Sequence, residues 1–276
     1  MASSNDIVAV ICHGGFLTPQ PYQPFIQALK AKGIETHCPQ LPSSDLTKLN
    51  VGDIQNPDYN REPPEGGYPQ GEHDAKLIVD ILRPLIDEQG KRVLMIGHSA
   101  GGWVATEASR PELQERVRKE KGLRGGIIGI FYISAILVPV GESITSFSQP
   151  KDGPVEPPPG MKFYKHGLIS TEGADKLLFN DLEEPEAQKW AKTLTAGPGF
   201  NSKLTNNAYA ALPLAYLVTE RDVVMPKEHQ EGMVALQSQK TGELTIYRCQ
   251  TGHFPQLSWT DGLVGAVQDF IIKVKD

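Results

Sequence analysis

Hydrophobic and polar positions follow two patterns along most of the chain: short continuous apolar runs, and longer stretches with apolar residues three or four apart. Residues 7–12 form a continuous apolar run, which is typical of a strand buried on both faces of a sheet. Phe25, Ile26 and Leu29 are instead spaced to lie on one face of a helix, which we expect over residues 21–32.

The same alternation recurs and predicts an α/β fold. Strands are expected to begin near residues 7, 34, 93, 126, 214 and 244. Helices are expected over residues 21–32, 72–89, 100–109, 111–121, 227–239 and 260–274. Because strands that alternate with helices are joined by crossover connections, the sheet of about six strands should be mainly parallel, with helices on both faces.

Two segments interrupt the alternation. Residues 39–69 are polar and rich in Pro, Gly and Asn, and they are too long for an ordinary connection, so we interpret them as a functional or mobile loop. From residue 139 to 213 the alternation stops, and this stretch includes the Pro-rich run 156–160. We interpret 139–213 as a cap inserted into one core domain, which residues 1–138 and 214–276 form together.

Composition narrows the class of protein. A chain of 276 residues that is 39% apolar can bury a substantial core as one domain, and the formal net charge of −6 disfavours binding to nucleic acid or anionic membranes. There is no stretch of 18 apolar residues, and the N-terminal residues lack the pattern of a signal peptide. The 3 cysteines fit neither a disulfide framework nor a zinc site, so we expect a cytoplasmic protein without a bound metal.

The strongest chemical motif is G-x-S-x-G at residues 97–101, between the strand expected at 93–96 and the following helix. The motif requires a sharp strand-to-helix turn, in which the glycines allow close approach and the serine hydroxyl is exposed. The N-terminus of the helix also favours negative charge that develops nearby. We therefore predict Ser99 to be a catalytic nucleophile.

A His-Gly-Gly-Phe turn directly follows the first strand. A tetrahedral intermediate carries a negative oxygen that needs preorganised N–H donors. We expect the backbone amide of Ala100 to be one donor and that of Gly15 the second, with Phe16 as the alternative. His13 is expected to orient this loop by hydrogen bonding, and His98 to pack and hydrogen-bond beside the nucleophile. Taken alone, a Gly-Gly turn that follows a histidine also occurs without a catalytic role.

Two more polar side chains follow the ends of the last two strands: Asp222 and His253. The carboxyl ends of parallel strands meet at one edge of the sheet, where ligands bind in open α/β folds. His253 is predicted to be the general base that takes the proton of Ser99, and Asp222 the acid that orients its ring. Glu220 lies closer to the strand end and is the competing candidate for the acid.

With these residues in place, the whole chain resembles the α/β-hydrolase superfamily, in which Ser, Asp and His follow in this order. It is more similar to the cofactor-free branch that holds plant methyl esterases and hydroxynitrile lyases, with fungal and bacterial relatives. Hydroxynitrile lyases of this branch place Thr and Lys where this chain has Gly14 and Phe254, which favours ester hydrolysis here. Epoxide hydrolases and haloalkane dehalogenases carry Asp where this chain has Ser99.

The resemblance implies a serine hydrolase that cleaves a small or medium carboxylic ester or lactone and needs no cofactor. Phe16, His98, Trp190 and Phe254 are the candidate substrate contacts, although each could equally be a core residue. Two alternatives stay open. The same residues could serve C–C bond hydrolysis, a lyase reaction or a cyclisation, or the chain could be a ligand-binding receptor on this scaffold. The oligomeric state is not readable from the sequence.

Overall fold

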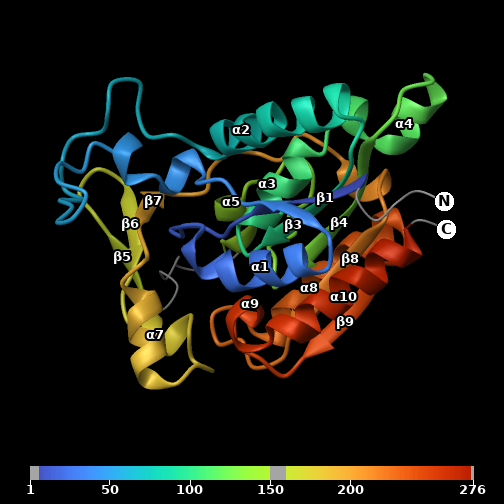
Figure 1. Ribbon diagram of the computed structural model, residues 1–276. Helices are drawn as coiled ribbons and strands as arrows, with labels where there is room; N and C mark the ends of the chain where they lie inside the picture. The colour runs from blue at the N-terminus through green and yellow to red at the C-terminus, as the bar shows by residue number, and fades with distance from the viewer. Residues whose placement is uncertain (1–5, 150–159, 275–276) are drawn as a thin grey trace.

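The computed structural model describes residues 6–149 and 160–274, and its centre is a six-stranded sheet (Figure 1). All neighbouring strands in this sheet run parallel. Its order is β2-β1-β3-β4-β8-β9, with β1 (Ile7–Cys12), β2 (Glu35–His37), β3 (Arg92–His98), β4 (Gly126–Ile133), β8 (Leu214–Thr219) and β9 (Thr245–Cys249). These six strands begin within one residue of the expected positions, so the predicted α/β class is confirmed.

Helices cover both faces of the sheet (Figure 1). On β1, Val8 and Val10 belong to a core cluster shared with α2 (Gly71–Arg83) and α3 (Gly101–Ala108). Ala9 and Ile11 belong to a second cluster, shared with α1 (Gln23–Ala31) and α10 (Thr260–Lys273). Because successive side chains of a strand point to opposite faces, a strand covered on both faces is apolar at every position, which explains the continuous runs.

Two of the predicted helices are irregular, and each irregular part begins at a proline. The helix expected over residues 72–89 is α2 followed by a π-helical turn, Pro84–Glu88. Pro84 has no N–H to donate to the preceding turn, so the regular α-helical pattern ends there. The helix expected over residues 111–121 begins as a 3₁₀ turn, Pro111–Leu113. The other helices of the core are α4 (Glu115–Glu120), α8 (Lys227–Thr241) and α9 (Pro255–Ser258).

The segment 139–213 contains a small antiparallel sheet that the sequence analysis did not predict. Its strands are β5 (Met161–Phe163), β6 (Leu168–Thr171) and β7 (Ala196–Pro198), and its helices are α5 (Ile144–Ser148), α6 (Ala174–Leu177) and α7 (Glu184–Ala191). Strands of three or four residues are too short to show a hydrophobic period, and β7 includes a glycine and a proline. Residues 156–159 of the Pro-rich run lie outside the described residues.

The long polar segment 39–69 packs against the small sheet. Leu49 and Val51 share a cluster with Leu168 of β6. The rings of Tyr59 and Tyr164 lie 5.0 Å apart, edge to face. These contacts hold the 39–69 segment against residues 139–213. The segment is long because it reaches from the main sheet to the small sheet.

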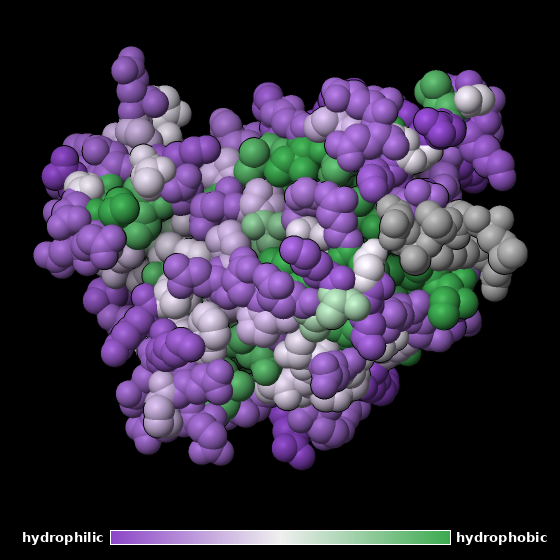
Figure 2. Space-filling view, viewed as in Figure 1, coloured by the Kyte–Doolittle hydropathy of each residue, from purple (hydrophilic) through white to green (hydrophobic). Residues whose placement is uncertain are grey.

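Polar side chains dominate the face of the molecule in Figure 2, where apolar residues are scattered in small groups. Within residues 6–149 and 160–274, we find no helix with the length and apolar character needed to span a membrane.

Candidate active site

Ser99 lies at the turn between β3 and α3 with a φ of +54°, in the left-handed region that non-glycine residues rarely adopt. Such a conformation costs of order 1 kcal/mol and persists only where the surroundings fix it. The amide of Ser99 donates to the carbonyl of Ile133, at 3.2 Å. Its own carbonyl accepts from the amides of Gly102 and Ile136, both at 3.0 Å. The turn is therefore pinned by the end of β4 and by α3, as the motif at 97–101 requires.

The two glycines of the motif allow this turn to press against β1. A Cβ atom at Gly101 would overlap the carbonyl oxygen of Cys12, and one at Gly97 would lie 2.8 Å from the Cα of Gly102. The loop after β1 consequently lies directly beside the serine, since a Cβ at Gly14 would be 3.0 Å from the Cβ of Ser99.

The backbone amides beside Ser99 differ in whether they donate a hydrogen bond within the protein. The amide of Gly14 donates to Tyr22 Oη at 3.1 Å, and that of Phe16 donates to Ser44 Oγ at 3.0 Å. In the part of the chain that the structure describes, the amides of Gly15 and Ala100 have no hydrogen-bond partner. Gly15 and Ala100 thus remain the predicted oxyanion donors. The alternative, Phe16, is disfavoured because its amide is already bound.

Asp222 and His253 are brought together at the carboxyl ends of adjacent strands β8 and β9. His253 Nδ1 donates to Asp222 Oδ2 at 2.6 Å, and both residues are buried. Asp222 Oδ1 also accepts from the amides of Val224 and Met225, each at 2.9 Å. Burial alone would raise the pKa of Asp222, but the charge of His253 and these hydrogen bonds outweigh it and hold the pKa below its usual value. Asp222 is therefore an ionised partner for the imidazole.

Glu220, the competing acid, is directed elsewhere. Its carboxylate contacts the side chains of Arg248 and Gln250 at the surface. Of these two carboxylates, only Asp222 bonds to His253. The geometry favours Asp222 as the acid.

His98, next to the serine, links the turn to His253. Its Nε2 donates to the carbonyl of His253 at 2.9 Å, and its Nδ1 accepts from Tyr22 Oη at 2.5 Å. The rings of His98 and His253 lie 4.8 Å apart. This is the packing and hydrogen-bonding role that the sequence analysis expects for His98.

His13 anchors the loop in the same way. Its Nδ1 donates to the carbonyl of Gly14 at 2.8 Å, and its Nε2 accepts from the amide of Leu41 at 2.9 Å. A proton on the accepting nitrogen of His13 or His98 would break a buried hydrogen bond. Burial lowers the pKa of His13 to about 4, and burial together with the charge of His253 lowers that of His98 to about 3.

Because the pKa values of His13 and His98 are lowered in the folded protein, we expect the protein to lose stability in mild acid. In the unfolded chain they take up protons near pH 6.5, whereas in the folded protein they stay neutral, so their stabilisation is complete above pH 6.5 and falls as the pH drops towards 4. Each group lowers the free energy of unfolding by about 1.4 kcal/mol per pH unit below pH 6.5. Together His13 and His98 therefore lower it by about 4 kcal/mol at pH 5. Burial raises the pKa of Asp74 to about 6, which works in the opposite direction. Protonation of Asp74 offsets about 1.4 kcal/mol of the loss caused by the two histidines at pH 5.

The expected net result is a free energy of unfolding that is about 3 kcal/mol lower at pH 5 than at pH 7, measured by urea titration. The variant His98→Gln should lose about half of the histidine contribution to this pH dependence. Equal stability at pH 5 and pH 7 in the unaltered protein would contradict the neutral-histidine assignment.

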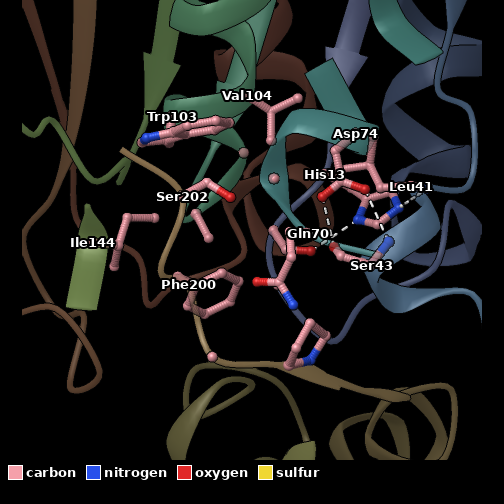
Figure 3. Close-up of a pocket in the computed structure, with 17 residues that line it drawn as sticks. His13, Leu41, Ser43, Gln70, Asp74, Trp103, Val104, Ile144, Phe200 and Ser202 are labelled. Atoms are coloured by element: carbon pink, nitrogen blue, oxygen red, sulfur yellow. Dashed lines mark hydrogen bonds between the residues drawn. The ribbon is translucent and has the colours of Figure 1, made fainter. Parts of the chain in front are cut away.

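A cavity of about 30 Å³ lies beside the turn that holds Ser99 (Figure 3). Its walls include Gly15 and Ala100, the residues with free amides, and it is closed by Trp103, Val104 and Phe200. Ligand pockets commonly measure about 300 Å³ or more. A substrate larger than a few atoms therefore requires side chains to move.

Phe200 covers the loop after β1. A Cβ atom at Gly15 would overlap its ring, and the rings of Phe200 and Phe16 lie 5.4 Å apart. The carbonyl of Phe200 accepts from the amide and hydroxyl of Thr145, at 3.0 and 2.9 Å. The backbone at Phe200 is thus anchored, while its ring lies against Gly15.

One carboxylate, Asp74, lies on the cavity wall beside His13 and Leu41, across from Trp103 and Ile144 (Figure 3). It is buried and accepts hydrogen bonds from the amide and hydroxyl of Ser43, at 2.9 and 2.6 Å. This pair ties the 39–69 segment to α2, so Asp74 shapes the cavity from the side of the long loop.

The predicted substrate contacts do not line this cavity. Phe254 and His98 are fully buried, with their rings 5.0 Å apart. Trp190 lies on α7 and packs against the second core cluster, and Phe16 lies under the ring of Phe200. An aromatic residue on a short amphipathic helix can face either the core or a pocket, and Trp190 faces the core.

Sequence reasoning missed Trp103, Phe200 and Asp74 as lining residues. Trp103 had a usable signal, because it lies four residues after Ser99 and so one helical turn on. Phe200 and Asp74 reach the cavity through contacts distant in sequence and had no such signal.

Comparison with known proteins places these features in a family. A model of the alpha/beta hydrolase family matches residues 9–266. The chain is 28% identical over 266 residues to the alpha/beta hydrolase nvfD of Aspergillus novofumigatus (strain IBT 16806), covering 94% of each protein.

Solved structures give the same result for the fold. A pyrethroid hydrolase from Sphingobium faniae JZ-2 matches with a TM-score of 0.69 and 18% identity, covering 96% of each chain. The methylesterase MES16 from Arabidopsis matches with a TM-score of 0.65 and 17% identity, covering 96% of this chain and 98% of that one. The predicted resemblance to plant methyl esterases and their fungal relatives is confirmed.

Proposed function

The chain belongs to the alpha/beta hydrolase family, and on that premise we propose that it is a serine hydrolase that cleaves a small or medium carboxylic ester or lactone through an acyl-enzyme intermediate. The observation that carries the proposal is the buried hydrogen bond of 2.6 Å between His253 Nδ1 and Asp222 Oδ2. It lies beside the strained turn that holds Ser99, because His98 of that turn donates to the carbonyl of His253.

In this mechanism Asp222 fixes the proton of His253 on Nδ1, which leaves Nε2 to accept the proton of Ser99. The serine oxygen attacks the ester carbonyl, and the amides of Gly15 and Ala100 stabilise the resulting oxyanion. His253 then gives its proton to the leaving alcohol. Water attacks the acyl-enzyme by the same route, so the carboxylic acid is released and the serine hydroxyl is restored.

Residues 139–213 serve in this proposal as a cap on a core formed by residues 1–138 and 214–276. The cap contributes Ile144 and Phe200 to the cavity, and α3 contributes Trp103 and Val104. An apolar cavity beside two free amides suits a small acyl group whose carbonyl oxygen reaches the amides. The partner is a small molecule, and the expected location is the cytoplasm.

Phe200 should limit the size of the acyl group. Replacing it with alanine is expected to raise the ratio of kcat/KM for p-nitrophenyl hexanoate over p-nitrophenyl acetate by about 10-fold, because the cavity then admits several more methylenes. Phe163→Ala is the matched control, since Phe163 is exposed on β5 and 55% accessible. An unchanged ratio in Phe200→Ala would show that the acyl group does not pass under this ring.

Rapid mixing with p-nitrophenyl acetate tests the proposed reaction. The expected result is a burst of about one p-nitrophenol per protein, followed by slower steady hydrolysis, because acylation precedes deacylation. No release above the uncatalysed rate would contradict ester hydrolysis. A burst without turnover would move the assignment to another reaction of the same residues, such as C–C bond hydrolysis or cyclisation.

A further inference from the structure

Two neighbouring side chains of the 139–213 segment hydrogen-bond the loops that carry the proposed acid and base. Asp181 Oδ2 accepts from the amide of Gly252 at 2.7 Å. Asn180 Nδ2 donates to the carbonyl of Arg221 at 3.1 Å. Gly252 and Arg221 each directly precede a proposed catalytic residue in the chain. One short piece of the cap therefore contacts both loops through their backbones.

The preceding residue fixes this piece in the core. Phe179 is fully buried, and its ring lies 4.5 Å from that of Phe254, which directly follows the proposed base. Phe179 belongs to the same core cluster as α1 and α10. Residues 179–181 are thus anchored on one side by packing and on the other by hydrogen bonds to the two loops.

Gly252 lies in close contact with the side chains of both Asn180 and Asp181. A Cβ atom there would overlap Asn180 Oδ1 and lie 2.8 Å from Asp181 Oδ1. These two oxygens are buried and have no hydrogen-bond partner among the described residues.

The two loops are also joined to each other. The amide of Arg221 donates to the carbonyl of Thr251 at 2.9 Å. Together with the contacts of Asn180 and Asp181, this closes a ring of hydrogen bonds around the backbones of the acid and base loops. On its other side, His253 is held by the donation from His98 to its carbonyl.

We propose that Asn180 and Asp181 are positioning residues, which hold the acid and base loops in register so that the bond between Asp222 and His253 is formed before substrate binds. This inference rests on the proposed function. It assigns the cap a role in the chemistry in addition to covering the cavity. Because a displacement of about 1 Å can cost roughly 100-fold in rate, small shifts of either loop should be visible in kcat.

Asp181→Ala is the first test. Its kcat for p-nitrophenyl acetate should fall about 10–100-fold while KM changes less than about 3-fold, since the base is misplaced but the cavity is intact. The rate at which a fluorophosphonate labels Ser99 should fall by a similar factor, because labelling needs the same base. Asp181→Asn should recover most of the rate, since its amide oxygen can still accept from Gly252.

Glu183→Gln is the matched control, because Glu183 is an exposed cap carboxylate with no side-chain capping hydrogen bond. It should keep the unaltered rates. If Asp181→Ala does not fold, Asn180→Ala makes the same test on the acid loop. In either alanine variant, wild-type kcat and labelling rate in the folded protein would overturn the inference, as would an Asp181→Asn rate as low as that of Asp181→Ala. If the unaltered protein neither labels nor hydrolyses, the proposed function itself fails.

Discussion

Replacing His253 with glutamine is expected to lower kcat for p-nitrophenyl acetate by about 10⁴-fold or more, because the variant has no group that can take the proton of Ser99. Glutamine is close to histidine in size, and its amide can still donate to Asp222. His253 is 1% exposed and its ring touches His98 and Phe254, so a side chain of similar volume protects the packing. Steady-state kinetics with the purified variant measures the effect.

A histidine outside the site provides the control for this prediction. His229 is exposed on α8, so His229→Gln should keep kcat within about twofold, as is usual for surface substitutions. If His253→Gln retains more than about a tenth of the activity, His253 is not the general base and the proposed mechanism fails.

The second large effect is expected at the acid. Asp222→Asn should lower kcat by about 10³–10⁴-fold, because an asparagine amide can donate to His253 Nδ1 and so favour the wrong tautomer. Glu220→Gln should change kcat less than about threefold, since Glu220 contacts Arg248 and Gln250 and not the imidazole. The reverse outcome, with Glu220→Gln inactive and Asp222→Asn active, would show that the acid is Glu220. The pair of variants therefore decides between the two carboxylates that the sequence left open.

The main sheet was predictable because most of its strands had a strong local signal. In β1 and β4 every residue is buried, and the run of apolar side chains is correspondingly unbroken. β2 has only three residues and none of them is fully buried, yet its place after a helix and before a proline-rich stretch was sufficient. The strands of the small sheet lack both the length and the context, so they were missed.

The candidate site was partly predictable for a related reason. Ser99, Asp222 and His253 each follow a strand, and the ends of parallel strands meet at one edge. The sequence could not show which amides are free, because the bonds from Gly14 to Tyr22 and from Phe16 to Ser44 join distant parts of the chain.

Residues of the segment proposed as a cap, 139–213, were the least predictable. Phe200 reaches Gly15, and Asp181 reaches Gly252, from segments without a clear hydrophobic period. Trp190 had the more visible pattern, on a helix, but it faces the core. Packing between the cap and the core is decided by shape and by long-range hydrogen bonds, and a local pattern contains neither.

The most direct test of the central claim, that Ser99 is an activated nucleophile, is to treat the protein with a fluorophosphonate and locate the adduct by mass spectrometry. We expect one adduct, on the peptide that contains Ser99, and none in Ser99→Ala, with the loss of p-nitrophenyl acetate hydrolysis in that variant. The absence of an adduct, or an adduct on another serine that persists in Ser99→Ala, would contradict the account.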